Sequence, residues 1–427
     1  MGRPVFIIDG SRTPFIKARS GPGPFTPVDL AVQCGRPLLA RQPFAPTAFD
    51  QVILGCVNVI ADEMNPARVA ALRLGMGEKM VAFTVQINCG SGMQSIDTAY
   101  RYIREGVSDL ILAGGAEALS HAPLVWPQGG VRWFAGLAGA KGMAAKIMAA
   151  LKVKPSYFKP IIGLERGLTD PITELNMGQT AEVVGQLFGI TREQSDAYAA
   201  ESHQRLAHAQ KEGFLKGELE TAFSRDGNYY DHDDGVRPDS TPESLAKLRP
   251  VFERPWGQVT AGNSSQITDG ASWVILASEE AVAKHGLMPK AAIVDSQWAA
   301  LDPSIMGLGP VLSATALLKR NDLSLQDVET WELNEAFATQ VLGCLAAWKD
   351  EKFCKEVLGL DGAAGEIDRA KLNVDGGAIS LGHPVGTSGN RIVLHLVNAM
   401  KRLGTRRGIA TECIGGGQGG AMLIEMV

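Results

Sequence analysis

The sequence has few cysteines and no paired cysteine spacing. Six cysteines are scattered over 427 residues, and no Cys-x-x-Cys or His-x-x-x-His pattern suggests a zinc site. This excludes a disulfide framework and favours a reducing compartment. No apolar run is long enough to span a bilayer, and residues 5–9 already read as a strand without a charged leader before them. We therefore expect a soluble, cytoplasmic protein.

The sequence also lacks a strong excess of either charge. It has 41 basic and 46 acidic side chains, a formal charge of -5, which gives no global reason to expect nucleic-acid binding. One segment departs from this balance, because residues 118–164 contain no Asp or Glu. The basic residues of this segment are Arg132, Lys141, Lys146, Lys152, Lys154 and Lys159. Apolar residues recur between them at three- and four-residue spacing, which predicts a basic amphipathic helix.

The first part of the chain alternates strand-like apolar runs with helical patterns. Strands are expected at residues 51–55, 82–87 and 109–113, and helices after Pro66 and Ser91. This alternation is typical of an α/β layered fold with a largely buried sheet.

A similar order returns late in the chain and predicts a divergent internal repeat. Residues 328–333 read as a strand, a helix follows from Glu335, and residues 407–411 read as another strand. Residues 121–250 do not follow the repeat. Within them, Thr191 and Gln194 form a capping box for a long helix that ends near Gly213. We expect a first half at 1–120 and 251–285, an inserted domain at 121–250 and a second half at 286–427.

Cys89 lies in a Gly-rich turn between a predicted strand and a predicted helix. The turn reads Asn-Cys-Gly-Ser-Gly over residues 88–92. A helix dipole and free amides at this position favour a thiolate, and Gly90 and Gly92 leave the approach to the thiol uncluttered. Cys89 is therefore a candidate nucleophile. The bland alternative is a structural thiol in a tight turn.

Two further Gly-rich turns carry His383 and Cys413. His383 lies in the glycine-constrained stretch 376–389, where an imidazole is held rigidly and can act as a base. Cys413 begins the turn 413–419. The internal repeat would bring the three turns to one crevice, which is the arrangement that acyl transfer through a thioester requires. The other thiols read as buried bystanders at Cys34, Cys56 and Cys344, with Cys354 partly exposed.

Together these blocks resemble the thiolase family, and the resemblance runs nearly the whole length of the chain. The motifs are residues 11–15, 88–92, 114–117, 177–182, 260–269, 334–337, 382–384 and 413–417. The resemblance implies an α/β thiolase-like fold, with two similar βαβαβαββ halves in five αβαβα layers and an inserted loop domain.

The resemblance also implies a role for each catalytic candidate. Cys89 looks like the nucleophile that is acylated, His383 like its activating base, and Cys413 like the acid/base that handles the acetyl-CoA proton. Asn334, which alone would read as a helix cap, should hold a water that forms one oxyanion hole with His383. The backbone amides of Cys89 and Gly415 should form the other.

Coenzyme A is the implied co-substrate, with no permanently bound cofactor and no metal. Ser265 resembles the serine that contacts the pantetheine arm, in the same polar turn as Ala261, and Arg237 is expected near the adenine nucleotide. Met177 and Asn176 are also expected to bind CoA. Several short-chain members of the family have His where this chain has Asn176. A homodimer or homotetramer is expected.

The resulting prediction is an acetyl-CoA C-acyltransferase that cleaves 3-ketoacyl-CoA in fatty acid β-oxidation through an acyl-cysteine intermediate. The alternative is acetoacetyl-CoA synthesis from two acetyl-CoA. A decarboxylating ketosynthase would need a second histidine where Asn334 stands, and a binding module would not need Cys89. The basic stretch 132–159 could attract the phosphates of CoA, or it could contact a membrane surface or a multifunctional β-oxidation subunit, as the longer loop of some thiolases does.

Overall fold

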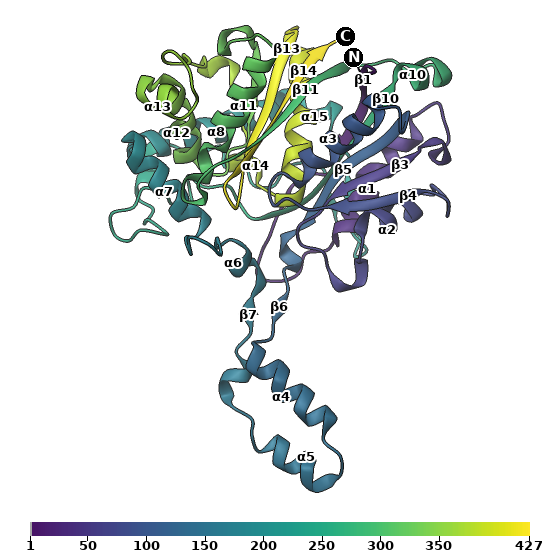
Figure 1. Cartoon of the computed structure of the whole chain (residues 1–427), viewed down its shortest axis with the longest axis vertical. Helices are drawn as coiled ribbons and strands as arrows, with labels where there is room; N and C mark the ends of the chain where they lie inside the picture. The colour runs from purple at the N-terminus through teal and green to yellow at the C-terminus, as the bar shows by residue number, and fades with distance from the viewer. Residues whose placement is uncertain (1) are drawn as a thin grey trace.

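The computed structural model describes residues 2–427, which form a layered body and one long projecting arm (Figure 1). The first half contributes β1 (Val5–Arg12), β2 (Ile16–Lys17), β3 (Gln51–Gly55), β4 (Val81–Val85), β5 (Leu110–Ala118), β10 (Thr268–Ser278), α1 (Pro27–Ala40), α2 (Pro66–Arg73), α3 (Ser91–Arg104) and α10 (Glu279–His285). The second half contributes β11 (Ala291–Ala300), β12 (Thr330–Leu333), β13 (Arg407–Ile414), β14 (Gln418–Met426), α11 (Gly309–Arg320), α12 (Ala338–Lys349), α13 (Glu351–Glu356), α14 (Ala378–Leu381) and α15 (Val385–Leu403).

The strands of both halves follow one hydrogen-bonded path. Their order is β12-β13-β14-β11-β1-β10-β5-β3-β4, with β2 paired to β10. In the first half β3 pairs in parallel with β4 and β5, and in the second half β12 pairs in parallel with β13. The halves meet where β1 pairs with the start of β11, through Phe6 with Ala292 and Ile7 with Ala291.

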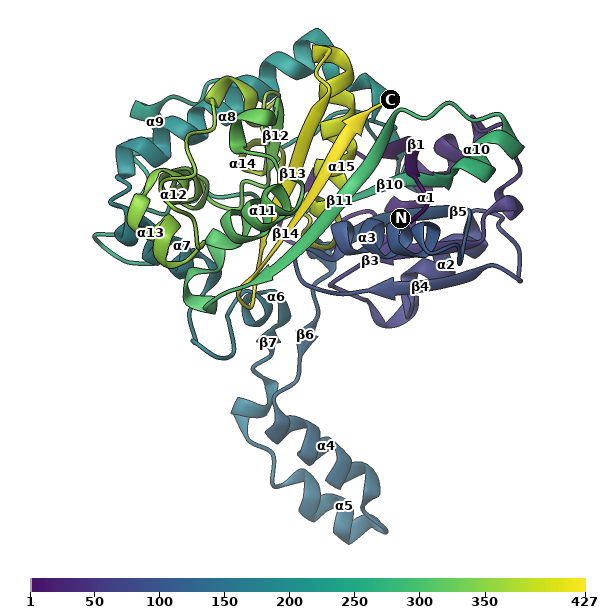
Figure 2. The ribbon, with the colours of Figure 1, turned by 45° about the horizontal axis from the view of Figure 1, so that its top comes forward.

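Three hydrophobic cores show that the body has five layers. Helices α1 and α2 pack on the outer face of the first half of the sheet, and α11 and α12 pack on the outer face of the second half. Helices α3 and α15 lie between the two halves of the sheet (Figure 2). Representative residues of this central core are Ile53, Met93, Ile96, Val393 and Met422. The αβαβα prediction is confirmed, and the central layer holds the helices that follow the Cys89 and His383 turns.

The segment between the halves contains α6 (Gly163–Gly167), α7 (Met177–Phe188), α8 (Arg192–Glu212), the hairpin β8 (Ala222–Phe223) and β9 (Tyr229–Tyr230), and α9 (Pro242–Ala246). Helix α8 has the predicted boundaries. Thr191 accepts a hydrogen bond from the Gln194 amide in a reciprocal capping box, and Gly213 ends the helix with a positive φ of 73°.

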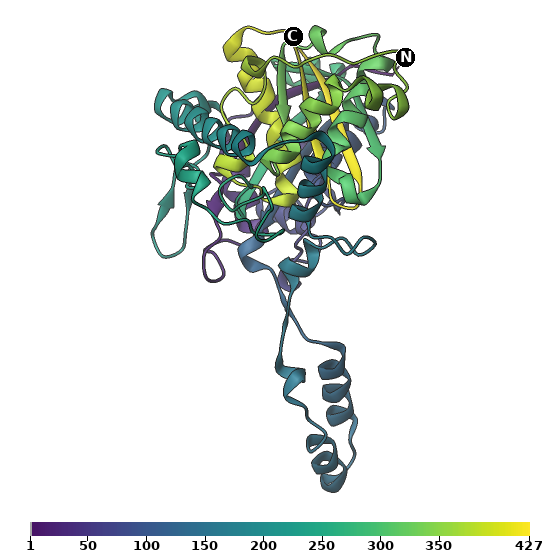
Figure 3. The same ribbon diagram turned by 90° about the vertical axis from the view of Figure 1, so that its left-hand side faces the viewer.

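The arm consists of the strand pair β6 (Leu124–Val125) and β7 (Ile161–Ile162) and the helices α4 (Gln128–Gly139) and α5 (Met143–Ala150). It leaves the body as a narrow stalk and ends in the two helices (Figure 3). The prediction of one basic amphipathic helix is wrong. Ala140 is extended and Gly142 has a φ of 83°, so the chain breaks and reverses between α4 and α5.

Two further expectations are wrong in detail. The helix predicted from Glu335 begins at Ala338, because Phe337 is extended and pairs with Ser264. Cys354 is buried rather than partly exposed. Asp350 ends α12 and caps α13, which turns the chain so that the Cys354 thiol donates to the carbonyls of Ala347 and Trp348 at 3.4 Å.

Candidate active site

The Cys89 turn connects the edge strand β4 to the central helix α3. Asn88 takes a left-handed conformation with a φ of 45°, and the Ser91 hydroxyl bridges the turn by donating to the Asn88 carbonyl and accepting from the Ile87 amide. The Asn88 side chain donates to the Gly415 carbonyl at 2.8 Å. This bond joins the first-half turn to the second-half hairpin, although 327 positions separate the residues.

Gly92 allows the start of α3 to touch the start of α15. A Cβ atom at this position would lie 2.6 Å from the Asn390 nitrogen and 2.9 Å from the Thr387 oxygen. At Gly90 a Cβ would lie 2.6 Å from Ile414 Cδ1. The two glycines therefore face packed protein, not an open approach to the thiol as the sequence suggested. Their role is to bring the Cys89 turn against α15 and the β13–β14 hairpin.

Burial raises the pKa of the Cys89 thiol to about 12. A hydrogen bond from the Gly415 amide opposes this increase, and the charge of Glu412 adds to it. The expectation that the helix terminus favours a thiolate in the resting protein is therefore wrong, because the cost of burying the charge is larger. The thiol must lose its proton to a base during attack.

His383 is 8% exposed and has one ring nitrogen free for that task. Its Nδ1 lies 2.6 Å from the Ser388 hydroxyl, which itself donates to the Pro384 carbonyl. Ser388 therefore accepts from Nδ1, so the proton lies on Nδ1 and the lone pair on Nε2. The Nε2 atom is buried and has no hydrogen-bond partner within residues 2–427. Burial and the charge of Arg391 lower the pKa of His383 to about 4, so the ring is neutral near pH 7.

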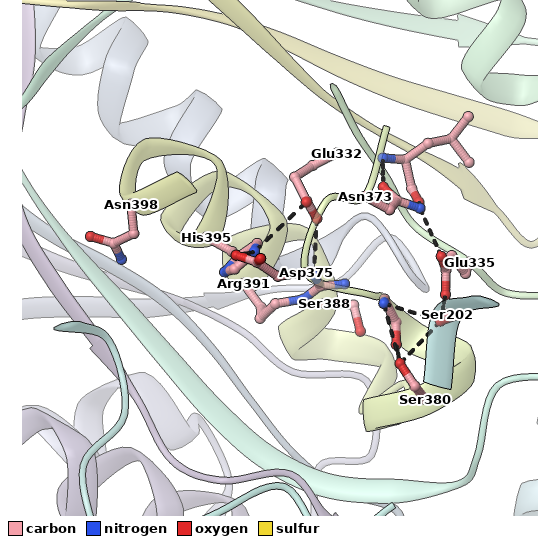
Figure 4. A network of polar contacts seen from close by, with 12 residues as sticks. Ser202, Glu332, Glu335, Asn373, Asp375, Ser380, Ser388, Arg391, His395 and Asn398 are labelled. Atoms are coloured by element: carbon pink, nitrogen blue, oxygen red, sulfur yellow. Dashed lines mark hydrogen bonds and ion pairs between the residues drawn. The ribbon is translucent and has the colours of Figure 1, made fainter. Parts of the chain in front are cut away.

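A buried ionic network is centred on α15, the helix that follows the His383 turn (Figure 4). Arg391 donates to Glu332 at 3.1 Å, and His395 lies 2.9 Å from Glu218 and 3.4 Å from Asp375. These carboxylates raise the pKa of His395 to about 10, despite its burial. The network ties α15 to β12 and to the inserted segment, and the charge of Arg391 adds to burial in keeping His383 neutral.

Cys413 lies within β13 and not in the turn that follows it, which begins at Gly415. The residue is 1% exposed, and burial together with the nearby Cys89 thiol raises its pKa well above the usual value. Its surroundings are apolar and consist of Met177, Met306, Ala336 and Phe337. The second thiol is thus close to the first and packs in an apolar cluster suited to an acyl chain.

Asn334 directly follows β12 and is 1% exposed. Its backbone amide donates to the Thr411 carbonyl at 2.9 Å, which fixes it two residues from Cys413 on the adjacent strand. Neither Oδ1 nor Nδ2 has a hydrogen-bond partner within the described chain. A buried amide with both polar atoms unpaired is costly in a folded protein, so this side chain is suited to binding something polar that enters the site.

The residues expected to hold CoA fall into two groups. The first group comprises Met177, which packs in the cluster of Cys413, together with Asn176, Ser265 and Ala261. A Cβ on Gly415 would contact Met177 Sδ at 3.3 Å, Asn176 caps α7, and Ser265 donates from its backbone to Ala336 at 2.9 Å. Ala261 is exposed in the same turn as Ser265. Arg237 is the second group, and its backbone amide donates to His203 Nδ1 at 3.1 Å.

The surroundings of Arg237 are basic. Burial and the charges of Arg237 and Arg19 lower the pKa of Lys17. The charges of Arg237 and Lys17 also contribute to lowering the pKa of His203, which burial lowers most, to about 4. Lys17, Arg19 and Arg237 are here called the basic cluster. Asp234 pairs with Arg19 at 3.3 Å and offsets part of this charge, and a phosphate would neutralise the remainder.

Gln266 links the basic cluster to the base, and the sequence analysis did not single it out. Its carbonyl accepts from the His383 amide at 2.9 Å, and its side-chain amide donates to the Gly235 carbonyl at 2.7 Å. Gly235 precedes Arg237 by two residues. The signal in the sequence was only its place at the end of the polar turn 260–266.

Glu117 is a second positioning residue that the sequence analysis did not single out. It is fully buried, and its carboxyl accepts backbone N–H groups of Val57 at 3.1 Å, Asn58 at 2.9 Å and Gly386 at 2.9 Å. Gly386 is the second residue of α15, immediately after the His383 turn. Burial raises the pKa of Glu117 to about 7 in spite of these donors.

Replacing Glu117 with glutamine should destabilise the fold and lower kcat. An amide NH2 would face backbone donors, which costs about 1–3 kcal/mol and loosens the start of α15. Because its folded pKa is raised, the carboxyl stabilises the wild type fully below its ordinary pKa of 4.5 and progressively less as pH rises through about 7. In urea unfolding at pH 5 and pH 8, the stability difference between wild type and variant should narrow at pH 8. A difference that widens would contradict this assignment.

Comparison with known proteins agrees with this geometry. Residues 5–280 match the family model "Thiolase, N-terminal domain", and residues 287–426 match "Thiolase, C-terminal domain". The chain is 40% identical to beta-ketoadipyl-CoA thiolase of Pseudomonas aeruginosa, over 100% of both chains. Its fold matches acetyl-CoA acetyltransferase of Bacillus anthracis with a TM-score of 0.86 and 35% identity, over 100% and 99% of the two chains. It also matches human mitochondrial 3-ketoacyl-CoA thiolase in complex with CoA with a TM-score of 0.85 and 36% identity, over 100% and 98%.

Proposed function

Because the chain belongs to the thiolase family, a family of acyltransferases that use coenzyme A as co-substrate, we propose that it cleaves 3-ketoacyl-CoA in fatty acid β-oxidation. The products are acetyl-CoA and an acyl-CoA that is two carbons shorter. The observation that carries this proposal is the bond from the Asn88 side chain to the Gly415 carbonyl at 2.8 Å. It brings the Cys89 turn to the end of the strand on which Cys413 packs in an apolar cluster.

In the first half-reaction, His383 Nε2 takes the Cys89 proton and the thiolate attacks the C3 carbonyl of the substrate. The C2–C3 bond breaks, and its electron pair passes to the enolate of acetyl-CoA. Cys413 gives its proton to C2, and acetyl-CoA leaves an acyl group on Cys89. Asn334 with His383, and the amides of Cys89 and Gly415, stabilise the oxygen atoms on which negative charge develops.

In the second half-reaction, the Cys413 thiolate takes the thiol proton of a new CoA. The CoA thiolate attacks the acyl group on Cys89, and the departing Cys89 thiolate recovers its proton from His383. Every group returns to its starting protonation state. Cys89 and His383 are both neutral in the resting protein, which fits this cycle. The Cys413 thiolate and the protonated His383 coexist only while the acyl group is attached to Cys89.

The acyl group is proposed to be aliphatic. Met177, Met306, Ala336 and Phe337 surround Cys413 without a basic side chain among them. Burial of each additional methylene there would contribute about 0.8 kcal/mol to binding. A substrate such as 3-ketoadipyl-CoA would instead bring a carboxylate into apolar surroundings, which is costly.

The test compares kcat/KM for thiolysis of acetoacetyl-CoA, 3-ketooctanoyl-CoA and 3-ketoadipyl-CoA. We expect the eight-carbon substrate to be cleaved most efficiently. A strong preference for acetoacetyl-CoA would overturn the degradative role in favour of the second candidate, acetoacetyl-CoA synthesis. The similarity to an acetyl-CoA acetyltransferase favours that candidate, and the same residues catalyse condensation in reverse.

The remaining CoA contacts are proposed as follows. Ser265 and Ala261 line the pantetheine arm, Met177 and Asn176 lie at the thioester, and the basic cluster holds the phosphates of the nucleotide. Changing Lys17 and Arg237 together to glutamine should raise KM for CoA about 10-fold and leave kcat unchanged, because binding is lost equally in the ground state and the transition state.

The matched control for this prediction is Lys79→Gln, a change of an exposed lysine elsewhere on the body. Steady-state kinetics with CoA and with 3′-dephospho-CoA separates the phosphate contribution. If the double variant binds CoA as tightly as wild type, the nucleotide lies elsewhere.

Three broader features complete the proposal. The boundaries 1–120 with 251–285, 121–250, and 286–427 are the proposed division into a first half, a loop domain and a second half. The six cysteines are all free thiols, which supports the cytoplasm as the proposed location. A homodimer or homotetramer is the proposed assembly, to be measured by analytical ultracentrifugation.

No helix within residues 2–427 is long and apolar enough to cross a membrane.

A further inference from the structure

Glu412 is a buried carboxyl that directly precedes Cys413 on β13 and has no part in the reaction steps above. Successive side chains of a strand point to opposite faces of the sheet, so Glu412 points away from the side that holds the Cys413 thiol. Ala410, which shares its face, packs in the central core with residues of α3 and α15. The Glu412 side chain therefore lies in the central layer, between the sheet and these two helices.

Helix α15 has a glycine where the Glu412 carboxyl meets it. A Cβ atom on Gly389 would lie 2.3 Å from Glu412 Oε1 and 2.6 Å from the Met93 backbone nitrogen of α3. Gly389 directly follows Ser388, the residue that accepts the hydrogen bond of His383 Nδ1. The carboxyl thus fits closely where α15 meets α3, one position from Cys413 in the strand and beside the residue that orients His383.

Glu412 has no bonded partner in these surroundings. Neither carboxyl oxygen has a hydrogen-bond partner within residues 2–427. On the adjacent elements, β14 presents Gly420 opposite it and α3 presents Met93. The charge of Arg391 on α15 favours the ionised carboxyl, but this guanidinium donates to Glu332 of β12 at 3.1 Å (Figure 4). Arg391 is therefore already committed to another carboxylate.

The neighbouring ionic network is balanced without Glu412. Its cations Arg12, Arg391, His395 and Arg402 pair with the carboxylates Glu218, Asp233, Glu332 and Asp375. A further buried carboxylate without a partner is costly. Burial accordingly raises the pKa of Glu412 well above its ordinary value, and the charge of Arg391 offsets this only in part. The carboxyl is protonated and neutral in the resting protein near pH 7.

The protonation of Glu412 matters because its charge acts on both thiols. Burial raises the pKa of Cys89 and of Cys413 most, and the charge of Glu412 adds to the increase at each. Both residues pass through thiolate forms in the proposed reaction, Cys89 when it attacks and Cys413 after it has protonated C2. A carboxylate beside them makes each thiolate harder to form, whereas the neutral acid does not.

We propose that Glu412 is a positioning residue that acts through Cys89 and Cys413: thiolysis proceeds while its carboxyl is protonated and slows when the carboxyl releases its proton to solvent as pH rises. The residue thereby sets the alkaline limit of activity. This inference rests on the proposed function, because the charge has this effect only on a reaction that forms thiolates at these two positions.

The kinetic test compares kcat/KM for thiolysis of 3-ketooctanoyl-CoA by wild type and by Glu412→Gln between pH 7 and 10. Glutamine has the shape of the neutral acid and cannot ionise, so the ratio of variant to wild-type activity should rise about 10-fold over this range. The ratio cancels the titration of CoA and of the substrate, which is the same for both proteins. Glu412→Met also lacks an ionisable group and should give the same rise.

The matched control is Glu78→Gln, which changes an exposed carboxyl elsewhere on the body and should give a constant ratio. Thermal unfolding at pH 7 reports whether each variant is folded. A purely structural role for Glu412 would lower the activity of its variants equally at every pH. A constant ratio for both Glu412 variants, with an active wild type, would therefore overturn this inference and leave the proposed function standing.

Infrared difference spectroscopy tests Glu412 independently of activity. The spectrum of wild type minus Glu412→Gln at pH 7 should contain the C=O band of a protonated carboxyl. The band should disappear over the pH range in which the kinetic ratio rises. A carboxylate band at pH 7 would overturn the inference. A wild type that cleaves no 3-ketoacyl-CoA at pH 7 would overturn the proposed function together with it, whatever the infrared result.

Discussion

Replacing Cys89 with alanine is expected to lower kcat/KM for thiolysis at least about 10⁴-fold, because the only proposed acyl carrier is removed. The fold should survive, since alanine fits the turn and the bonds that hold it belong to Asn88 and Ser91. The measurement is steady-state cleavage of a 3-ketoacyl-CoA, followed by the loss of its absorbance. Circular dichroism and thermal unfolding of the variant report whether the fold is kept.

The matched control is Cys354→Ala, which removes a buried thiol on α13, outside the three turns of the proposed site. This variant should lose some stability, because the Cys354 thiol bonds to the carbonyls of Ala347 and Trp348, and it should keep its activity. Wild-type thiolysis by Cys89→Ala would remove Cys89 from the mechanism. It would also favour the reading of a structural thiol in a tight turn.

Replacing His383 with glutamine is expected to lower kcat about 10²–10⁴-fold, the usual contribution of a general base. The residue acts on a thiol whose pKa burial raises to about 12, so little thiolate exists without the base. The pH profile of wild type carries a second signature. Because the pKa of His383 is lowered to about 4, the base stays neutral through pH 5 and is lost only as pH falls through about 4.

We therefore expect no decline of wild-type kcat/KM with a midpoint near 6.5. The profile should be measured between pH 5 and 8, because a histidine of ordinary pKa would titrate within this range. His208→Gln is the control, since His208 is exposed and lies outside the crevice. An acid limb centred near 6.5, or full activity of His383→Gln, would be inconsistent with the assigned base.

Much of the fold was predictable because its signals are local. The strand runs that begin at Gln51 and Leu110 are buried and stand out as continuous apolar stretches. The run at Val81 is also apolar, although it forms the half-buried edge strand. The capping box at Thr191 and the glycine at 213 fix α8 from both ends. The repeat of strand, Gly-rich turn and helix was enough to suggest that the distant turns share one crevice.

The features that were missed depend on burial and on long-range contacts. The helix terminus at Cys89 suggested a thiolate, but the cost of burial depends on Ile414, Gly415 and Glu412, which come from the other half of the chain. The sequence alone does not distinguish Glu117 from an ordinary acidic residue, because only the folded chain brings its three backbone donors to the carboxyl group. The apolar spacing in the arm was real, but Gly142 divided it into two helices.

The central claim is that Cys89 carries the acyl group, and trapping that group tests it most directly. The protein is incubated with 3-ketooctanoyl-CoA in the absence of free CoA, quenched in acid, digested with trypsin and analysed by mass spectrometry. Cys89 and Cys413 fall in separate tryptic peptides, residues 80–101 and 408–427. The account predicts a hexanoyl mass increase on the 80–101 peptide alone, with acetyl-CoA released in equal amount. An acyl group on the 408–427 peptide, or acetyl-CoA release with no modified cysteine, would contradict it.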